Sequence, residues 1–186
     1  MIKLFNSVFL LSIVVSIYSC TEKKEEVKVV ALEEVVCDAE NLSKDSVYFV
    51  SNSKLSVSKF SLGKKTSQEK AHSGKNSVRL TGESLFGMSN TIERVEAGEI
   101  YKVEIWRSST SKKGKIVATG VDSQDFYIDS SQPVERGVEN WNKLVIDIVI
   151  PASLNGKQLK IYAWNPDKSK VVFFDDMKIS YFGKKK

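Results

Sequence analysis

The stretch "IYAWNPDKSKVVFFDDMKIS" (residues 161–180) contains two runs in which apolar and polar side chains alternate, separated by the turn-forming residues NPDKSK. Such alternation is typical of β-strands that bury one face. The second run contains two adjacent acids, Asp175 and Asp176, although strands seldom contain Asp and burial of an unpaired carboxylate costs several kcal/mol. We therefore predict a strand in which Asp176 faces solvent and Asp175 faces inward with a compensating partner.

The same alternating pattern recurs through the chain from Val27 onward. Short runs rich in Val, Ile, Tyr and Phe are separated by clusters of Gly, Ser, Asn and Lys, and this spacing predicts an all-β fold, an antiparallel β-sandwich. The predicted strands are residues 47–50, 55–62, 76–82, 91–97, 100–109, 115–121, 125–132, 142–151, 158–165 and 171–182.

Length and charge indicate one domain of ordinary size. The chain has 186 residues, of which 27% are charged and 10% aromatic, and this is the balance of a globular protein. The formal net charge is +5, and part of it comes from residues 183–186, which we interpret as a solvated basic tail. Elsewhere Lys alternates with Glu and Asp, and no basic stripe with interleaved aromatic residues indicates nucleic-acid binding.

The N-terminus indicates export and a lipid anchor. Residues 1–19 combine one Lys with a short apolar run and have the form of a secretory signal peptide. Their end, "SIYSC", resembles a bacterial lipobox, which implies lipidation of Cys20; a plain signal peptide beside an unrelated Cys is the alternative. Residues 20–36 are interpreted as a polar spacer. The segment 24–26 (KEE) resembles the surface-export signal of Bacteroidetes lipoproteins, which implies an outer-membrane lipoprotein that faces the medium.

After lipidation of Cys20, Cys37 is the only other cysteine, so we expect no disulfide within the mature chain. It lies in the apolar stretch "VVALEEVVC". The sequence favours a small buried hydrophobic side chain over a reactive thiol.

Large aromatic residues are predicted on polar faces of two strands. In residues 100–109 and 158–165, each strand has one apolar face and one face that carries Trp beside Lys or Glu. Such a surface suits a sugar, because aromatic rings stack on the apolar faces of pyranose rings while polar neighbours hold the hydroxyls. Packing beneath a loop or a partner is the alternative. The predicted contacts are Trp106, Trp164, Tyr162, Glu104 and Arg107.

Five segments together resemble a known fold family. They are "AHSGKNSVRL" (71–80), "VEAGEIYKVEIWRS" (95–108), "NWNKLVIDIVIP" (140–151), "LKIYAWNP" (159–166) and "VVFFDDMKI" (171–179). Their order and spacing resemble the galactose-binding-like jelly rolls, in particular the carbohydrate-binding modules that accompany bacterial glycoside hydrolases. The resemblance covers residues 37–182, which we take as the domain.

The resemblance also implies a structural Ca²⁺ site at the edge of the sandwich. Carried over by position, its ligands would be Glu40, Glu69 and Asp175, with backbone carbonyls near His72 and Lys75. Calcium takes six to eight oxygen ligands, and carboxylates mixed with carbonyls meet that requirement. In the alternative interpretation, Asp175 only accepts hydrogen bonds from backbone N–H groups.

The sequence favours binding over catalysis. His72 is the single histidine, and no Ser/His/Asp set, zinc site or phosphate-binding loop is indicated. We therefore expect a non-enzymatic, carbohydrate-binding lipoprotein that holds a polysaccharide at the cell envelope. The alternative is a structural or protein-interaction module of the outer envelope with no sugar ligand.

Overall fold

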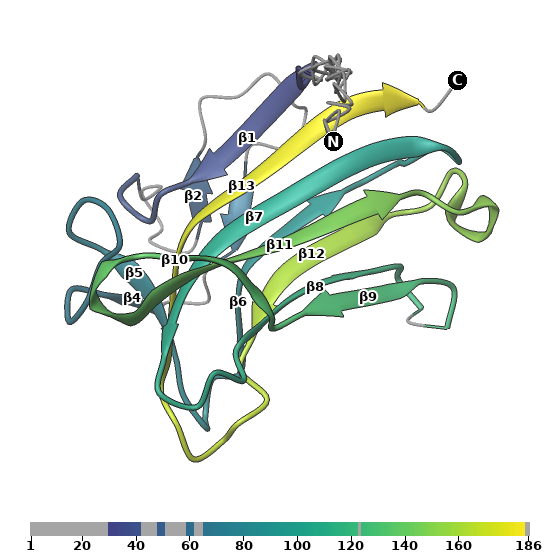
Figure 1. The fold of residues 1–186 in the computed structure, drawn as a ribbon. Coiled ribbons are helices and arrows are strands. Elements are labelled where there is room, and N and C mark those ends of the chain that lie inside the picture. Colours follow the sequence, from purple (N-terminus) through teal and green to yellow (C-terminus); the bar gives the residue numbers. More distant parts are fainter. Residues whose placement is uncertain (1–29, 42–47, 51–58, 62–64, 123, 185–186) are drawn as a thin grey trace, which may run out of the picture.

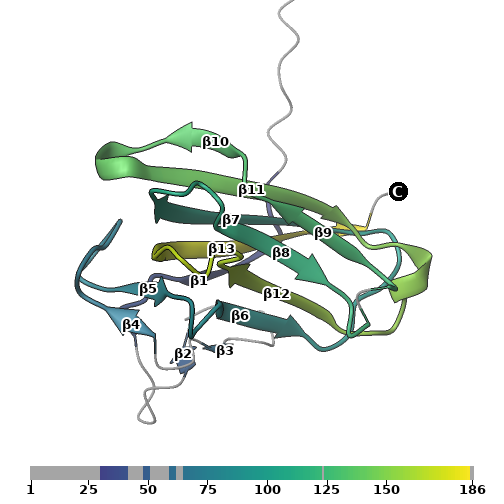
Figure 2. The same ribbon diagram turned by 90° about the horizontal axis from the view of Figure 1, so that it is seen from below.

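The computed structural model describes residues 30–41, 48–50, 59–61, 65–122 and 124–184. These residues form two antiparallel β-sheets that pack face to face (Figure 1, Figure 2). The predicted all-β antiparallel sandwich is therefore confirmed. Within the described part of the chain, no helix is both long enough and apolar enough to cross a membrane.

One sheet has seven strands and the other has six. The first follows the order β10-β11-β7-β13-β5-β4, with β1 also paired to β13, and the second follows β2-β3-β6-β12-β8-β9. The strands of the seven-stranded sheet are β1 (Glu33–Cys37), β4 (Thr66–Ser67), β5 (Ser77–Leu80), β7 (Glu99–Ser109), β10 (Pro133–Arg136), β11 (Trp141–Val149) and β13 (Val172–Lys184). Those of the six-stranded sheet are β2 (Tyr48–Val50), β3 (Lys59–Ser61), β6 (Phe86–Ile92), β8 (Lys115–Thr119), β9 (Tyr127–Ser130) and β12 (Leu159–Trp164). Short 3-10 turns lie at Val138–Asn140 and Ala152–Leu154.

The core lies between the two sheets and follows the predicted alternation. In β7, Val103 and Ile105 are fully buried, and in β12, Ile161 and Ala163 are fully buried. The residues between them point away from the core, to the outer face of their own sheet. Cys37 is also a free, buried thiol in this core, as predicted, and burial raises its pKa to about 12.

Strand β6 differs from the prediction. The sequence predicted a strand at 91–97, but the strand runs from Phe86 to Ile92 and the segment after it is irregular. Gly87 lies outside the predicted strands, whereas in the structure it pairs with Ala163 of β12 at a register shift. A glycine in a strand often marks such an irregularity.

Both ends of the described chain lie in the seven-stranded sheet. Strand β1 starts at Glu33, inside the segment interpreted as a spacer, and β13 continues to Lys184, inside the segment interpreted as a tail. The two pair antiparallel, with Glu33 opposite Tyr181 (Figure 1). The predicted signal peptide (1–19) and the lipidated Cys20 lie outside the described residues.

A bulge in β13 accommodates the two adjacent acids. Phe174 and Met177 are both fully buried although they are three positions apart, so the alternation is interrupted at Asp175 and Asp176. Asp176 has φ 49°, and one extra residue in a strand is the definition of a β-bulge. The same point divides the edge of β13, which pairs with β5 before the bulge and with β1 after it.

Candidate functional site

The two tryptophans predicted to form one binding surface lie on opposite sides of the molecule. Trp106 is on the outer face of β7 in the seven-stranded sheet, and Trp164 is on the outer face of β12 in the six-stranded sheet. The prediction of one shared surface is therefore wrong. Alternation within a strand shows which side chains share a face, but it does not show to which sheet the strand belongs.

The six-stranded sheet has a groove of about 690 Å³ on its outer face. Residues of β3, β6, β8, β9 and β12 line it, together with Lys65 and residues 120 and 121. This volume lies within the range of small-molecule and cofactor sites. We take this groove as the candidate functional site.

Aromatic side chains form one part of the groove. Phe86 and Tyr162 line it and meet edge to face, with ring centroids 5.7 Å apart. Trp164 lies beside them, stacked parallel to Phe86 at 6.1 Å. Phe86 is 50% exposed, so an apolar ring face is available to a ligand. Of the predicted contacts, the structure therefore brings together Tyr162 and Trp164.

Polar contacts hold the β8–β9 side of the groove. Tyr127 donates its hydroxyl to Asp129 at 2.8 Å, and Lys115 Nζ lies 3.0 Å from the same carboxylate and 5.6 Å from the Trp164 ring centroid. Burial and the hydrogen bond to Asp129 raise the pKa of Tyr127, and burial followed by the charge of Asp129 raises the pKa of Tyr162. Both phenols therefore stay protonated at neutral pH.

Arg107 and Glu104 do not reach this groove. Arg107 is 1% exposed, and its Nη1 donates to the carbonyl oxygens of Lys112, Gly114 and Ser131 at 2.9, 2.8 and 2.9 Å. Glu104 pairs with Lys178 at 2.8 Å on the outer face of the seven-stranded sheet. Arg107 is thus a structural residue, because its side chain points inward at the end of β7, and the prediction of a ligand contact is corrected.

Trp106 is covered by its neighbours. The His72 ring stacks on it at 4.0 Å with an interplanar angle of 15°, and Lys143 Nζ lies 5.0 Å from its centroid. A Cβ placed on Gly137 would lie only 2.9 Å from the indole. Trp141 is fully buried and meets His72 edge to face. These contacts leave Trp106 packed under the 70–76 loop.

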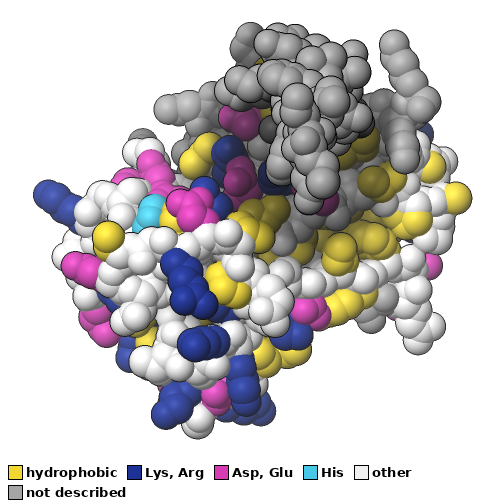
Figure 3. All heavy atoms as spheres, in the orientation of Figure 1, with side chains coloured by type: hydrophobic (Ala, Val, Ile, Leu, Met, Phe, Trp, Pro, Cys, Tyr) yellow, Lys and Arg dark blue, Asp and Glu magenta, His cyan; other side chains and the backbone are white. Residues whose placement is uncertain are grey.

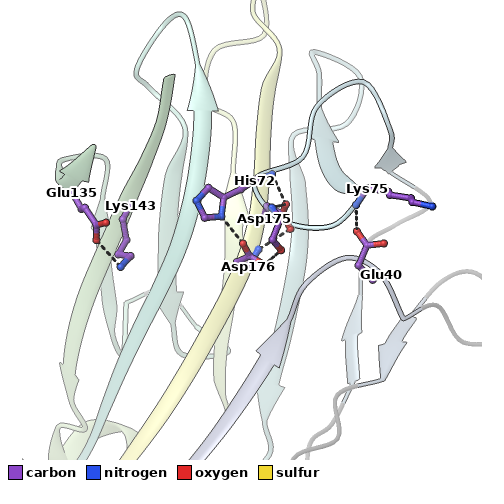
Figure 4. A network of polar contacts seen from close by, with 8 residues as sticks. Glu40, His72, Lys75, Glu135, Lys143, Asp175 and Asp176 are labelled. Atoms are coloured by element: carbon purple, nitrogen blue, oxygen red, sulfur yellow. Dashed lines mark hydrogen bonds and ion pairs between the residues drawn. The ribbon is translucent and has the colours of Figure 1, made fainter. Parts of the chain in front are cut away.

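The two acids of the bulge bind this loop to β13 (Figure 4). Asp175 accepts hydrogen bonds from the backbone N–H groups of His72 at 2.8 Å and Ser73 at 3.3 Å. Asp176 lies 2.6 Å from His72 Nδ1 and accepts the hydroxyl of Ser73 at 2.7 Å. The one histidine, cyan in Figure 3, accordingly lies beside acidic side chains at the surface. Asp175 is fully buried, but beneath the loop rather than in the core.

The three carboxylates predicted to bind calcium do not converge. Glu40 accepts the backbone N–H groups of Lys75 and Asn76, each at 2.7 Å, while Glu69 is exposed and pairs with Arg79 at 3.1 Å. Among the residues that the structure describes, no three His, Cys, Asp or Glu side chains form a group that could hold a metal. As they lie, Glu40, Glu69 and Asp175 do not fit the ion. Calcium binding stays a prediction. It is tested by comparing the melting temperature of the protein with and without EGTA.

The pKa of Asp175 predicts how stability depends on pH. Burial and the neighbouring Asp176 raise it from 3.8 to about 7, against the effect of the N–H donors. The folded state therefore keeps a proton that the unfolded chain loses, so this group's stabilising contribution is full below about pH 4 and is lost as the pH rises through 7. We expect the free energy of unfolding of the wild type, minus that of Asp175→Asn, to fall over this range.

Urea denaturation at a series of pH values measures this difference, and the subtraction removes the contribution of other carboxylates. Because His72 and Asp176 both face Asp175, the same comparison is repeated in a His72→Gln background. A difference that does not change between pH 4 and pH 7 would contradict the assignment.

Sequence reasoning missed several groove residues. Phe86 was missed because its segment was assigned to no strand. Tyr127 was missed because the acids of its segment, Asp122, Asp125 and Asp129, were interpreted as a solvent face. Lys160 could have been found, since it alternates with Tyr162 and Trp164 along β12. No pattern in the sequence indicated Lys65 as a binding residue. It lies just before β4, and only the three-dimensional fold places it beside the groove.

Comparisons of the sequence with known protein families and with curated proteins give no match. Solved structures do resemble the fold. The tandem CBM22-1–CBM22-2 domain of Paenibacillus barcinonensis Xyn10C aligns with a TM-score of 0.53 and 14% identity, over 86% of this chain and 49% of that chain. The CBM22-1 xylan-binding domain of the same protein gives a TM-score of 0.49 and 14% identity, over 81% and 95%. The Stig cyclase Fisc of Fischerella sp. TAU gives 0.47 and 9%, over 87% and 93%.

The similarity to the tandem domain, with a TM-score of 0.53, concerns the fold. The jelly roll predicted from the sequence is confirmed, and the similar solved structures include carbohydrate-binding modules. One fold supports many functions, so the ligand is argued below from the groove.

Proposed function

We propose that this chain is a non-catalytic carbohydrate-binding protein whose ligand lies in the groove of the six-stranded sheet. One observation carries the proposal: the groove combines exposed aromatic rings with polar side chains. Phe86 and Tyr127 are 50% and 46% exposed, and Tyr162 lines the space between their strands. A sugar needs this combination, since its C–H faces stack on aromatic rings and its hydroxyls need hydrogen-bonding partners.

The polar lining supplies both donors and acceptors. The groove is lined by Gln158 just before β12, Lys160 on β12, Ser89 and Thr91 on β6, and Ser61 on β3. A protein-interaction site would favour a flat apolar patch, whereas here the rings alternate with hydroxyl, amide and ammonium groups. This difference favours a glycan over an envelope protein as the ligand.

The same lining supports binding without catalysis. Hydrolysis of a glycosidic bond generally requires two carboxyl groups on either side of that bond. The described residues that line the groove include no Asp, Glu, His or Cys. His72 lies in the 70–76 loop over the opposite sheet, where it is engaged with Asp176.

Attachment to the envelope through a lipid on Cys20 is part of the proposal. It is supported by the lipobox-like sequence that ends at Cys20. Because β1 pairs with β13 in the seven-stranded sheet, the chain enters the domain from the sheet opposite the groove. We propose that the chain, anchored through Cys20, holds a polysaccharide at the outer membrane or cell surface.

A glycan array with the full chain, kept in mild detergent because of its apolar N-terminus, tests the proposal. We expect binding to a defined class of glycans. Absence of binding across a broad array would overturn the proposal and favour the alternative, a structural or protein-interaction module.

A further inference from the structure

The charges that line the groove are all positive. Lys65 and Lys160 line it, and none of the described lining residues is Asp or Glu. Lys160 is exposed in β12, which lies between β6 and β8 in the sheet. Its neighbours in register are Thr91 of β6 and Thr119 of β8. A groove with charges of one sign raises the local concentration of ligands of the other sign.

The neighbouring acids are already engaged. Asp129 accepts Tyr127 and pairs with Lys115. Glu93 accepts the side-chain amide of Gln158. The positive charges of the groove are therefore not neutralised by these acids.

The two groove lysines differ in this respect from several other lysines of the sheets. Lys115, Lys143 and Lys178 each have a carboxylate within 3.0 Å. In the described part of the chain, Lys65 and Lys160 have no carboxylate within 4.0 Å. Lys65 Nζ donates to the carbonyl oxygen of Phe86, and Lys160 Nζ lies 5.9 Å from the Tyr162 ring centroid.

The two ammonium groups therefore lie next to residues whose rings would bind the sugar. Lys65 contacts the backbone of Phe86, and Lys160 is close to Tyr162. Burial lowers the pKa of Lys65, so an anionic ligand group beside it would offset the cost of keeping the ammonium charged. A hydrogen bond between an ammonium and a carboxylate or sulfate is stronger than one between neutral groups.

We infer that the groove selects acidic glycans, which carry carboxylate or sulfate groups, and that Lys65 and Lys160 bind those groups while Phe86 and Tyr162 stack on the sugar rings. The inference rests on the proposed function and narrows its substrate class. Removing both lysine charges lowers the affinity for an acidic glycan at least about tenfold, equivalent to about 1.4 kcal/mol. The affinity for a neutral glycan falls by less than this, because the Gln side chains still donate hydrogen bonds to sugar hydroxyls.

Matched pairs of probes test the inference with the full chain. One pair is polygalacturonate and its carboxyl-reduced form; the other is a sulfated galactan and its desulfated form. Affinities are measured for the wild type, Lys65→Gln/Lys160→Gln and the control Lys102→Gln, which removes one positive charge from the opposite sheet. Melting temperatures establish that each variant is folded. The carboxylate and sulfate pairs show which anionic group the groove takes.

We expect the wild type to prefer at least one acidic probe over its neutral partner. The double variant loses this preference, whereas Lys102→Gln retains it. Added salt weakens the preference. Equal affinity for acidic and neutral probes would overturn the inference and leave the proposed function intact. Equal loss of affinity in Lys102→Gln would overturn it as well, because it would indicate attraction by net charge. Binding to no probe here and to no glycan of the array would overturn the proposed function itself.

Discussion

Arg107→Met is expected to lower the melting temperature by about 10 °C. The variant loses the hydrogen bonds from a charged, buried donor to the carbonyl oxygens of Lys112, Gly114 and Ser131. Hydrogen bonds to charged groups are worth about 1.5–3 kcal/mol each, and buried carbonyls left without a donor add to the cost. Allowing for loop relaxation we expect a loss of about 3 kcal/mol, and for a domain of this size each kcal/mol shifts the melting temperature by about 2–4 °C.

Arg79→Met is the matched control for this prediction. It makes the same substitution at a partly exposed arginine whose partner Glu69 is 62% exposed. Ion pairs at the surface contribute about 0–1 kcal/mol, so we expect a shift of no more than about 3 °C. Thermal unfolding followed by circular dichroism measures both variants. Similar shifts in the two variants would mean that Arg107 does not hold the segments around it together.

Tyr162→Ala is expected to weaken glycan binding about 30-fold or more. The substitution removes a ring that lines the groove and meets Phe86 edge to face. Aromatic residues at the centre of a binding surface commonly contribute about 2 kcal/mol or more, and 2 kcal/mol corresponds to about 30-fold in the dissociation constant. Isothermal titration with the glycan selected by the array measures the change, and Tyr162→Phe separates loss of the ring from loss of the hydroxyl.

Trp106→Ala provides the control on the opposite sheet. It removes an even larger aromatic residue, but one that His72 covers at 4.0 Å. We expect the dissociation constant to change less than about twofold, although the variant melts at a lower temperature. Loss of binding in folded Trp106→Ala, with Tyr162→Ala unaffected, would move the site to the seven-stranded sheet.

The sequence was sufficient to predict the sandwich because alternation is a local property. In β7 and β12, the predicted core residues such as Ile105 and Ile161 are buried. The pairing of strands is not local, since it depends on how the chain connects distant segments. Trp106 and Trp164 have the same alternation pattern and nevertheless lie on different sheets.

The acidic pair of β13 shows a second limit. The sequence predicted that Asp175 would be buried and compensated, and the structure shows backbone N–H groups of His72 and Ser73 as its donors. It could not show that a bulge places the 70–76 loop over Asp175 and Asp176, because a bulge is defined by the register of two strands. For the same reason, the packing of His72 on Trp106 was not predictable.

The central claim is that the glycan lies in the groove of the six-stranded sheet. The most direct test is to titrate the isotope-labelled full chain with the glycan selected by the array and to follow backbone amide signals by NMR. The claim predicts that the shifts concentrate in β6, β8 and β12, around residues such as Gly87, Thr119 and Tyr162. Shifts concentrated instead in β7 and the 70–76 loop would contradict it.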